Sequence, residues 1–251
     1  MKTAFDFSGK KYLVTGASSG LGRDISILLS KSGAQLVITG RNARELEKTL
    51  ETMSSSGHIG IAYDLSAEED FTELFERSVA DGCKLDGFVH SAGLMPLTPV
   101  NTLKKKTIND CLSVNLVAFL ELMRCFSKKK YRTEKAAVVG ISSICSLYPG
   151  KCQTVYAASK AAVNAAVQAL ALELYSKGIR VNSVLPGTIR TKGYDDNAVL
   201  VGEDTQAENI KKQIHGLIST EEVFNVVAFL LSDASSAITG RALFADGGYI
   251  N

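Results

Sequence analysis

The chain has 251 residues, of which 45% are hydrophobic and 22% are charged, and its formal net charge is +2. This composition predicts one globular domain over residues 1–251 and offers no electrostatic case for binding nucleic acid or an anionic membrane. The sequence has neither a run of 18 apolar residues, as a transmembrane helix needs, nor the N-terminal apolar stretch of a secretory signal. Its five cysteines include no Cys-x-x-Cys pair, which predicts reduced thiols in a cytoplasmic protein, without a disulfide framework or a metal site.

Short apolar runs alternate with longer amphipathic stretches along the chain. Helices are predicted near 21–32, 42–55, 67–80, 104–128, 155–176 and 220–231, and strands at 12–15, 36–39, 59–62, 87–90, 136–141, 181–184 and 242–245. Near-continuous apolar runs suit strands that are covered on both faces. The alternation therefore predicts an α/β fold: a single-domain, Rossmann-type, doubly wound sheet of seven parallel strands with helices on both faces.

A glycine-rich turn joins the first predicted strand to the first predicted helix. Glycines let the chain turn sharply and approach a pyrophosphate, and the helix N-terminus offers N–H groups to it. The spacing G-x-x-x-G-x-G differs from the commoner G-x-G-x-x-G, but its place between strand and helix still indicates a dinucleotide site. The predicted contacts are Gly16, Ser18, Ser19, Gly20, Leu21 and Gly22.

The end of the second predicted strand bears on the choice of nicotinamide cofactor. An NAD enzyme typically places an acidic side chain here to bond the ribose hydroxyls, whereas this chain has Gly40 followed by Arg41 and Asn42. A guanidinium can make a bidentate, charge-assisted contact with a 2′-phosphate. We therefore expect NADP(H) to be preferred over NAD(H), with Arg41 and Asn42 among the cofactor contacts.

Tyr156 and Lys160 lie four residues apart on a predicted helix and so share one face of it. A phenol has an ordinary pKa of about 10, and a nearby ammonium lowers it toward neutral pH. The pair is a candidate proton-transfer device. The alternative is an ordinary pair on a solvated helix face.

Several motifs, in order and over nearly the whole chain, resemble those of the short-chain dehydrogenase/reductases, and most of all the 3-oxoacyl-[acyl-carrier-protein] reductase type. They are the glycine-rich turn, Asp64-Leu65, Ser91-Ala92-Gly93, Asn115, Ser142-Ser143, Tyr156 to Lys160, Asn182 through Pro186-Gly187 to Thr191, and Thr239-Gly240 to Asp246-Gly247-Gly248.

The resemblance implies four catalytic residues. Tyr156 is then the general acid or base, and Lys160 lowers its pKa and bonds the nicotinamide ribose. Ser143 holds the substrate oxygen, with Ser142 as the less favoured neighbour, and Asn115 holds a water that relays protons from Lys160. The alternatives are a strand-end hydroxyl for Ser143 and a buried, backbone-bonded amide for Asn115.

The resemblance also implies further cofactor contacts and a division of the domain. Residues 8–140 are the nucleotide-binding half, and residues 141–251 are the catalytic and substrate half, with a lid over 189–215. Tyr156 and Lys160 touch the cofactor as well. The other contacts are Asp64 and Leu65 at the adenine, Ser91, Ala92 and Gly93 at the ribose, and Pro186, Gly187, Ile189 and Thr191 toward the nicotinamide.

The chain departs from the family pattern at three places. His90-Ser91 stands where two asparagines are usual, and we expect His90 to be a hydrogen-bonded strand-end histidine rather than a titrating group near the cofactor. The 189–215 segment is polar, and the segment that follows it lacks the usual Gly-Arg element, so the usual lid cannot be assumed.

The expected activity is the NADP(H)-dependent interconversion of a ketone and a secondary alcohol. The substrate is a small carbonyl or alcohol compound, free or carried on acyl carrier protein. A sugar, polyol or hydroxysteroid dehydrogenase is the alternative, and a non-catalytic NADP(H)-binding scaffold is a distant one. The predicted helices 104–128 and 155–176 resemble subunit-pairing helices, which favours a homotetramer over a dimer.

Overall fold

The computed structural model describes residues 5–66, 70–190 and 210–250. Its strands are β1 (Lys11–Thr15), β2 (Gln35–Gly40), β3 (Ile59–Ala62), β4 (Leu85–His90), β5 (Arg132–Ile141), β6 (Ile179–Pro186) and β7 (Ala242–Ala245). Its helices are α1 (Gly20–Lys31), α2 (Ala43–Thr52), α3 (Thr72–Ser78), α4 (Lys105–Leu112), α5 (Ala118–Phe126), α6 (Thr154–Leu174) and α9 (Thr220–Leu231).

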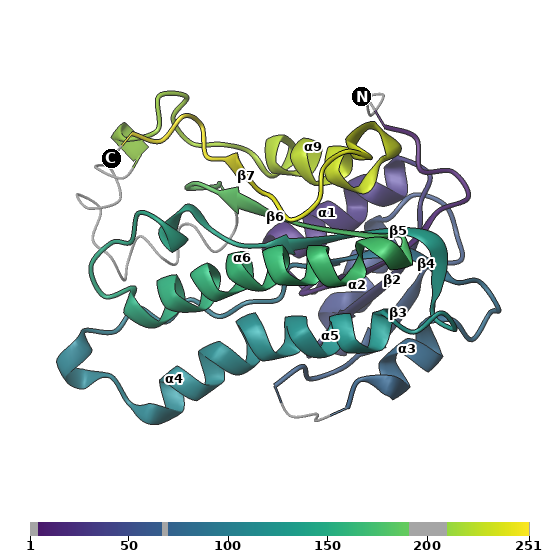
Figure 1. Cartoon of the computed structure of the whole chain (residues 1–251), viewed down its shortest axis with the longest axis horizontal. Helices are drawn as coiled ribbons and strands as arrows, with labels where there is room; N and C mark the ends of the chain where they lie inside the picture. The colour runs from purple at the N-terminus through teal and green to yellow at the C-terminus, as the bar shows by residue number, and fades with distance from the viewer. Residues whose placement is uncertain (1–4, 67–69, 191–209, 251) are drawn as a thin grey trace.

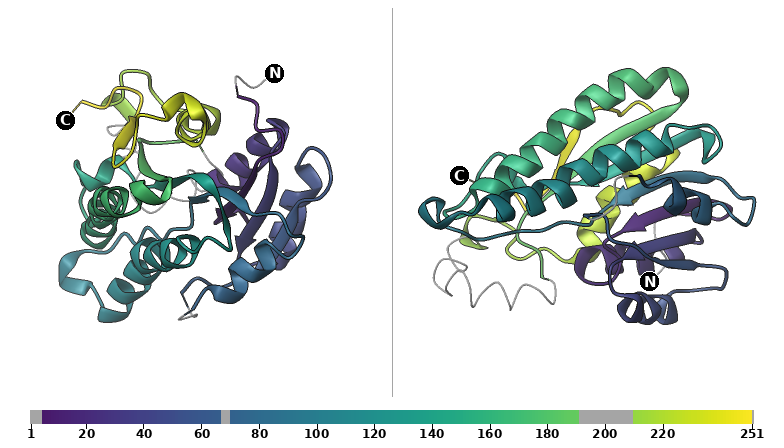
Figure 2. Two further views of the ribbon diagram at one scale, coloured as in Figure 1. Left: turned by 45° about the vertical axis from the view of Figure 1, so that its right-hand side comes forward. Right: turned by 90° about the horizontal axis from the view of Figure 1, so that it is seen from below.

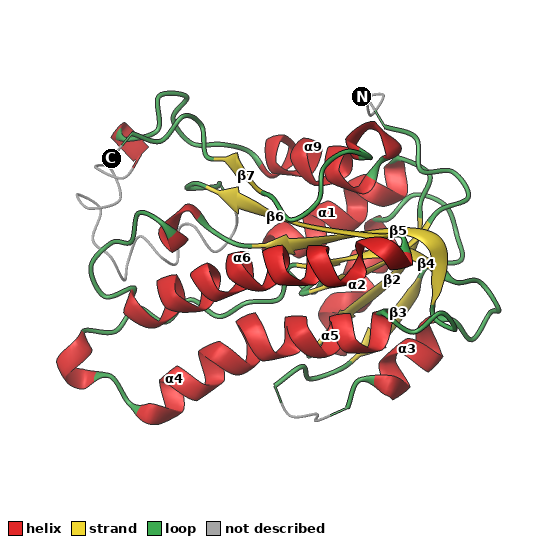
Figure 3. Ribbon diagram, in the orientation of Figure 1, coloured by secondary structure: helices red, strands yellow, loops and turns green. Residues whose placement is uncertain are grey.

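The strands form one parallel sheet in the order β3-β2-β1-β4-β5-β6-β7, which confirms the predicted doubly wound fold (Figure 3). The order reverses at β1, whose two neighbours are β2 and β4. In such sheets ligands bind outside the carboxyl ends of the strands at this reversal. Thr15, the last residue of β1, pairs in register with Thr39 of β2 and His90 of β4, so the three strands end at one level.

Alternate residues of the strands pack into two hydrophobic cores on opposite faces of the sheet. Leu13 and Val138 point into the core beneath α3, α5 and α6. Val14 and Val139 point into the core beneath α1, α2 and α9. Figures 1 and 2 show the two helix layers with the sheet between them.

The segment predicted as one helix over 104–128 has a change of helix type in its middle. A π-helical stretch, Ser113–Val117, joins α4 to α5. The wider π turn places Asn115 in the interior, beside α6. Short π stretches are frequent at functional sites.

α6 runs alongside α4 and α5 across the same face of the sheet (Figures 1 and 2). Judged by length and composition alone, the helical segment Thr154–Lys177 could cross a membrane. However, Val163 and Val167 on its inner face are fully buried against the sheet. The helix therefore has the position of a core helix, and its apolar character serves packing.

Candidate active site

The first wall of the site is the turn between β1 and α1. Gly16 (φ +70°) and Gly20 (φ +52°) take left-handed backbone conformations that favour glycine. A Cβ on Gly16 would lie 2.7 Å from the backbone nitrogen of Ala92, and one on Gly22 would lie 2.4 Å from the Gly16 carbonyl oxygen. Because α1 has no side-chain cap from Ser19 and no acidic residue in its first turn, the N–H groups there can receive an anion.

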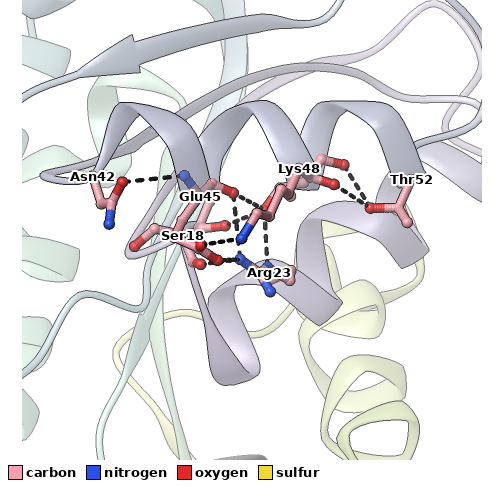
Figure 4. A network of polar contacts seen from close by, with 8 residues as sticks. Ser18, Arg23, Asn42, Glu45, Lys48 and Thr52 are labelled. Carbon is pink, nitrogen blue, oxygen red and sulfur yellow. Dashed lines mark hydrogen bonds and ion pairs between the residues drawn. The ribbon is translucent and has the colours of Figure 1, made fainter.

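Arg23, which was not among the predicted site residues, connects this turn to α2 (Figure 4). Its guanidinium donates to the carbonyl oxygen of Ser18 and, at 2.7 Å, to Oε2 of Glu45. Its Nε donates to Thr49 Oγ1 at 3.0 Å. Lys48 contacts the other oxygen of Glu45 at 2.5 Å. The arginine directly after the last glycine of the motif was the available sequence signal.

Gly40 and Arg41 form the corner next to the turn. A Cβ on Gly40 would lie 3.0 Å from Ser18 Oγ, so a longer side chain at this position would have to displace Ser18. Arg41 is exposed and lines the cavity. Asn42 lies outside the lining and caps α2 by accepting a backbone N–H at 3.2 Å.

Asp64 and Leu65 follow β3 and line the same corner, as does Tyr63, which was not predicted. Ser66 donates to Asp64 Oδ1 from both its Oγ (2.7 Å) and its backbone nitrogen (2.9 Å). These hydrogen bonds, with a smaller contribution from Arg41, hold the pKa of Asp64 below its usual value. Asp64 is therefore an anion that lines the same corner as the Arg41 guanidinium.

His90 is a fully hydrogen-bonded residue, as expected. Its Nε2 lies 3.2 Å from the Val114 carbonyl oxygen, which can only accept, so Nε2 carries the proton. Nδ1 then accepts from the Thr15 hydroxyl at 2.9 Å. Burial lowers the pKa of His90 to about 3, with Lys160 as the next cause. The imidazole is neutral and does not titrate near neutral pH.

Ser91, Ala92 and Gly93 carry the chain from the end of β4 along the cavity. A Cβ on Gly93 would come within 3.4 Å of both Asn115 Oδ1 and Lys160 Nζ. The absence of a side chain at Gly93 thus leaves room between the two predicted catalytic groups.

Asn115 lies in the π-helical stretch and is fully buried. Its Oδ1 accepts from the Leu94 backbone N–H at 2.7 Å, and its Nδ2 donates to the Leu94 carbonyl at 2.9 Å. Nδ2 also lies 2.8 Å from Ser159 Oγ and 3.4 Å from Cys111 Sγ. The amide joins the β4 loop to α6 from behind the cavity lining.

Tyr156 and Lys160 lie in the first turns of α6, and both line the cavity. Lys160 Nζ donates to the Ile141 carbonyl at 2.7 Å and lies 5.8 Å from the centre of the Tyr156 ring. The Ser143 hydroxyl contacts Tyr156 and accepts from a backbone N–H at 3.1 Å. Ser142 Oγ instead donates to the Lys160 carbonyl at 3.1 Å. These contacts bring together three of the predicted catalytic residues: Ser143, Tyr156 and Lys160.

Burial is the main influence on the protonation of Tyr156 and Lys160. It raises the pKa of Tyr156 above its usual value, Cys145 adds to the rise, and the hydrogen bond with Ser143 opposes it. Burial lowers the pKa of Lys160 to about 8. We expected Lys160 to lower the pKa of Tyr156, but in this structure burial outweighs any such effect.

The turn after β6 lies outside the cavity lining. Gln213, which is 2% exposed, accepts from the Thr188 N–H and donates to the Gly216 carbonyl at 2.7 Å. A Cβ on Gly187 would lie 2.6 Å from its Oε1. Ile189 pairs with Ile218 as an isolated bridge. Pro186 ends β6, and Thr191, with residues 191–209 of the predicted lid, lies outside the described residues.

The cavity enclosed by these walls has a volume of about 310 Å³. It brings together most of the predicted cofactor contacts, whereas Gly20, Asn42, Pro186, Gly187 and Ile189 do not line it. Residues that sequence reasoning did not select also line it: Tyr63, Leu94, Met95, Val114 and Ile141. Leu94 and Met95 directly follow Gly93, so continuing that motif would have found them.

Known proteins resemble the chain throughout its length. Residues 16–250 match the family model described as enoyl-(acyl carrier protein) reductase. The L-xylulose reductase of Caenorhabditis elegans is 33% identical, with 100% of both chains covered. The 3-oxoacyl-[acyl-carrier-protein] reductase of Rickettsia felis is 32% identical, with 98% of each covered.

A solved structure agrees with these sequence matches. The 3-oxoacyl (acyl-carrier-protein) reductase of Agrobacterium tumefaciens, crystallised with NADP bound, superposes with a TM-score of 0.85 at 27% identity, covering 99% of this chain and 97% of that one. The chain therefore belongs to the short-chain dehydrogenase/reductase family of oxidoreductases, which act on CH–OH groups.

Proposed function

We propose that the chain interconverts a ketone and a secondary alcohol with NADP(H), and that its leading substrate class is a 3-oxoacyl thioester carried on acyl carrier protein. The observation that carries the proposal is one cavity whose lining includes the Tyr156 phenol, the Lys160 ammonium and the glycine-rich turn.

The walls of the cavity suit a dinucleotide. A pyrophosphate can approach the backbone closely at Gly16 and Gly22, which have no side chains, and can bind the uncapped N-terminus of α1. Gly93 leaves room beside Lys160. When bound, a nicotinamide supplies or accepts the hydride. The chain's own residues position the substrate and move the proton.

The proton steps follow from the protonation states. Because burial raises the pKa of Tyr156, the phenol keeps its proton at neutral pH and can donate it from Oη to a ketone oxygen. Ser143, in contact with Tyr156, can hold that oxygen by a second hydrogen bond. In alcohol oxidation the proton travels the other way, to a tyrosinate that burial disfavours. The protonated phenol is the form that carbonyl reduction needs near pH 7.

The corner at Gly40 and Arg41 supports NADP(H) over NAD(H). A carboxylate that would bond the ribose and repel a 2′-phosphate is absent from position 40, where its Cβ would lie 3.0 Å from Ser18 Oγ. The exposed Arg41 guanidinium can pair with the phosphate. We expect a higher kcat/KM with NADPH than with NADH, and a loss of the NADPH advantage in Arg41→Ala. A wild-type preference for NADH would contradict this cofactor assignment.

The substrate proposal rests on likeness to relatives and is tested by a panel. NADPH oxidation is measured with 3-oxoacyl thioesters, ketoses and steroid ketones at equal concentrations. We expect the highest kcat/KM with a thioester. The L-xylulose reductase, 33% identical over its whole length, favours a sugar or polyol reductase as the second candidate. A ketose that outperforms every thioester would establish that second activity instead.

We also propose that the protein is a homotetramer. The outer faces of the π-helical stretch, α5 and α6 expose large apolar side chains: Val117 (49%), Leu120 (40%) and Leu172 (87%). Because α4–α5 and α6 lie side by side, these side chains belong to one helix layer (Figure 1). Pairing this layer with that of a second copy would bury them.

A further inference from the structure

Ser159 lies between Tyr156 and Lys160 on α6 but does not line the cavity. It is fully buried, as is Asn115 on the neighbouring helix. Its Oγ donates to the Tyr156 backbone carbonyl at 2.7 Å and accepts from Asn115 Nδ2 at 2.8 Å. One hydroxyl thus connects the turn that carries Tyr156 to the π-helical stretch that carries Asn115.

The hydrogen bonds of the Asn115 amide depend on this hydroxyl. Nδ2 has two hydrogens, and the Leu94 carbonyl takes one of them at 2.9 Å. Ser159 Oγ is the nearer acceptor for the second, because Cys111 Sγ lies 3.4 Å away and sulfur is a weak acceptor. Without the hydroxyl, a fully buried donor would keep only the thiol as a partner, which is costly.

The Ser159 hydroxyl does more than an ordinary helical serine. Ser78 on α3 is equally buried, and its Oγ also donates to a carbonyl of its own helix, that of Leu74, at 2.7 Å. Among the residues that the structure describes, Ser78 makes no hydrogen bond to a second helix, whereas Ser159 has the additional contact with Asn115. This difference makes Ser78 a matched reference for the local effect of a buried helical hydroxyl.

We propose that Ser159 is a positioning residue that fixes Asn115 relative to Tyr156 and Lys160. The inference rests on the proposed function, in which Tyr156 donates the proton, and on the expectation that Asn115 and Lys160 relay protons to it. Gly93 leaves only a narrow space between Asn115 Oδ1 and Lys160 Nζ, each 3.4 Å from the position of an added Cβ. A small rotation of the amide would therefore alter the surroundings of the Lys160 ammonium.

A double-mutant cycle tests this role. The variants are Ser159→Ala, Asn115→Ala, the double variant and Ser78→Ala as the control. Alanine is the best helix former, so both serine variants should fold. Steady-state kcat, the NADPH dissociation constant and the thermal midpoint are measured for each.

We expect Ser159→Ala to lower kcat by about tenfold, the effect of losing one hydrogen bond to the catalytic group. Neither Ser159 nor Asn115 lines the cavity, so NADPH affinity should be unchanged. In the Asn115→Ala background the same substitution should have almost no further effect on kcat. Ser78→Ala should show the shift in thermal midpoint that comes from losing a hydrogen bond within one helix, but keep full kcat.

Three outcomes would overturn the positioning role: wild-type kcat in Ser159→Ala, an equal loss in both backgrounds, or full activity in Asn115→Ala. The proposed function itself fails in a different way. In that case the wild type would oxidise no NADPH with any carbonyl compound.

Discussion

At the residue scale, the protonation of Tyr156 and Lys160 is decided by burial. Both side chains line a cavity at the carboxyl edge of the sheet, and desolvation favours the neutral form of each. The tyrosine therefore keeps its proton at neutral pH. The lysine, with a pKa of about 8, is close to its titration point.

Tyr156→Phe removes only the hydroxyl that is proposed to donate the proton. We expect kcat for carbonyl reduction to fall by about a hundred- to ten-thousand-fold, the usual contribution of general acid catalysis. NADPH binding, measured by fluorescence titration, should be preserved. Tyr12→Phe is the matched control, because Tyr12 is a buried phenol with a raised pKa at the opposite end of β1. Intact turnover in Tyr156→Phe would refute the proton-transfer role.

The pKa of Lys160 predicts a pH dependence. Its ammonium is present below pH 8 and is lost as the pH rises through that value, because burial has lowered the pKa. We expect kcat/KM for reduction to be level up to about pH 8 and then to fall by about tenfold per pH unit. Thermal midpoints recorded over the same range separate this titration from unfolding. A profile that stays level to pH 10 would show that the charge of Lys160 is not required.

At the element scale, the glycine-rich turn depends on α2 as well as on its own glycines. Arg23 donates to the Ser18 carbonyl and to Glu45 of α2, so one guanidinium fixes the distance between the turn and that helix (Figure 4). The backbone that would cradle the cofactor phosphates is thereby held in place.

Arg23→Met should loosen the turn while preserving the length of the side chain. We expect the NADPH dissociation constant to rise by about tenfold, the effect of one lost charged hydrogen bond, with kcat at saturation unchanged. Lys48→Met is the control, because it removes a positive charge from the same network, and the Lys48 ammonium contacts the Glu45 carboxylate and not the glycine-rich turn in the described part of the chain. Equal affinities in the two variants would indicate that Arg23 acts through charge alone.

The elements were predictable from sequence to the extent that apolar periodicity or a motif marked them. All seven strands and the helices α1, α2, α6 and α9 lie where the pattern placed them, because strand burial and helical amphipathicity repeat at different periods. The π-helical stretch was not predicted. A π turn adds one residue to a helix, and the apolar residues on either side of it keep a spacing close to that of an α-helix, so the sequence pattern does not reveal it. β5 begins at Arg132 rather than near 136, because its first pairing with β4 is irregular.

The residues of the candidate site likewise fall into those that the sequence predicted and those that it did not. Residues in motifs, such as Gly16 and Tyr156, were predicted and line one cavity. Arg23 and Ser159 were missed, because each acts through a contact between helices that are distant in sequence. The rise in the pKa of Tyr156 depends on burial, which a single motif does not encode.

At the scale of the whole molecule, the helix layer that contains α5 and α6 has two faces in different environments. Its inner face packs on the sheet, and its outer face exposes Leu172 and Val117. Such exposure is costly in water unless another surface covers it.

The assembly can be tested with one charge on this outer face. We expect light scattering to give the mass of a tetramer for the wild type and a smaller species for Leu172→Glu, because the carboxylate would be desolvated at the interface. Lys31→Glu, an exposed change on α1 in the other helix layer, should leave the mass unchanged. A monomeric wild type at micromolar concentration would contradict the proposed assembly.

The widened turn at Ser113–Val117 has a consequence for how this chain can evolve. A π turn accommodates one residue more than regular α winding, so deleting one residue there would restore the α-helix while the segments on either side keep their relative orientation. Asn115 would lose its place beside Ser159, whereas the outward stripe of α5 would stay aligned with that of α6. A single-codon deletion at this point would thus threaten the chemistry and spare the outer face, and length variation should be far better tolerated in the loops that flank these helices.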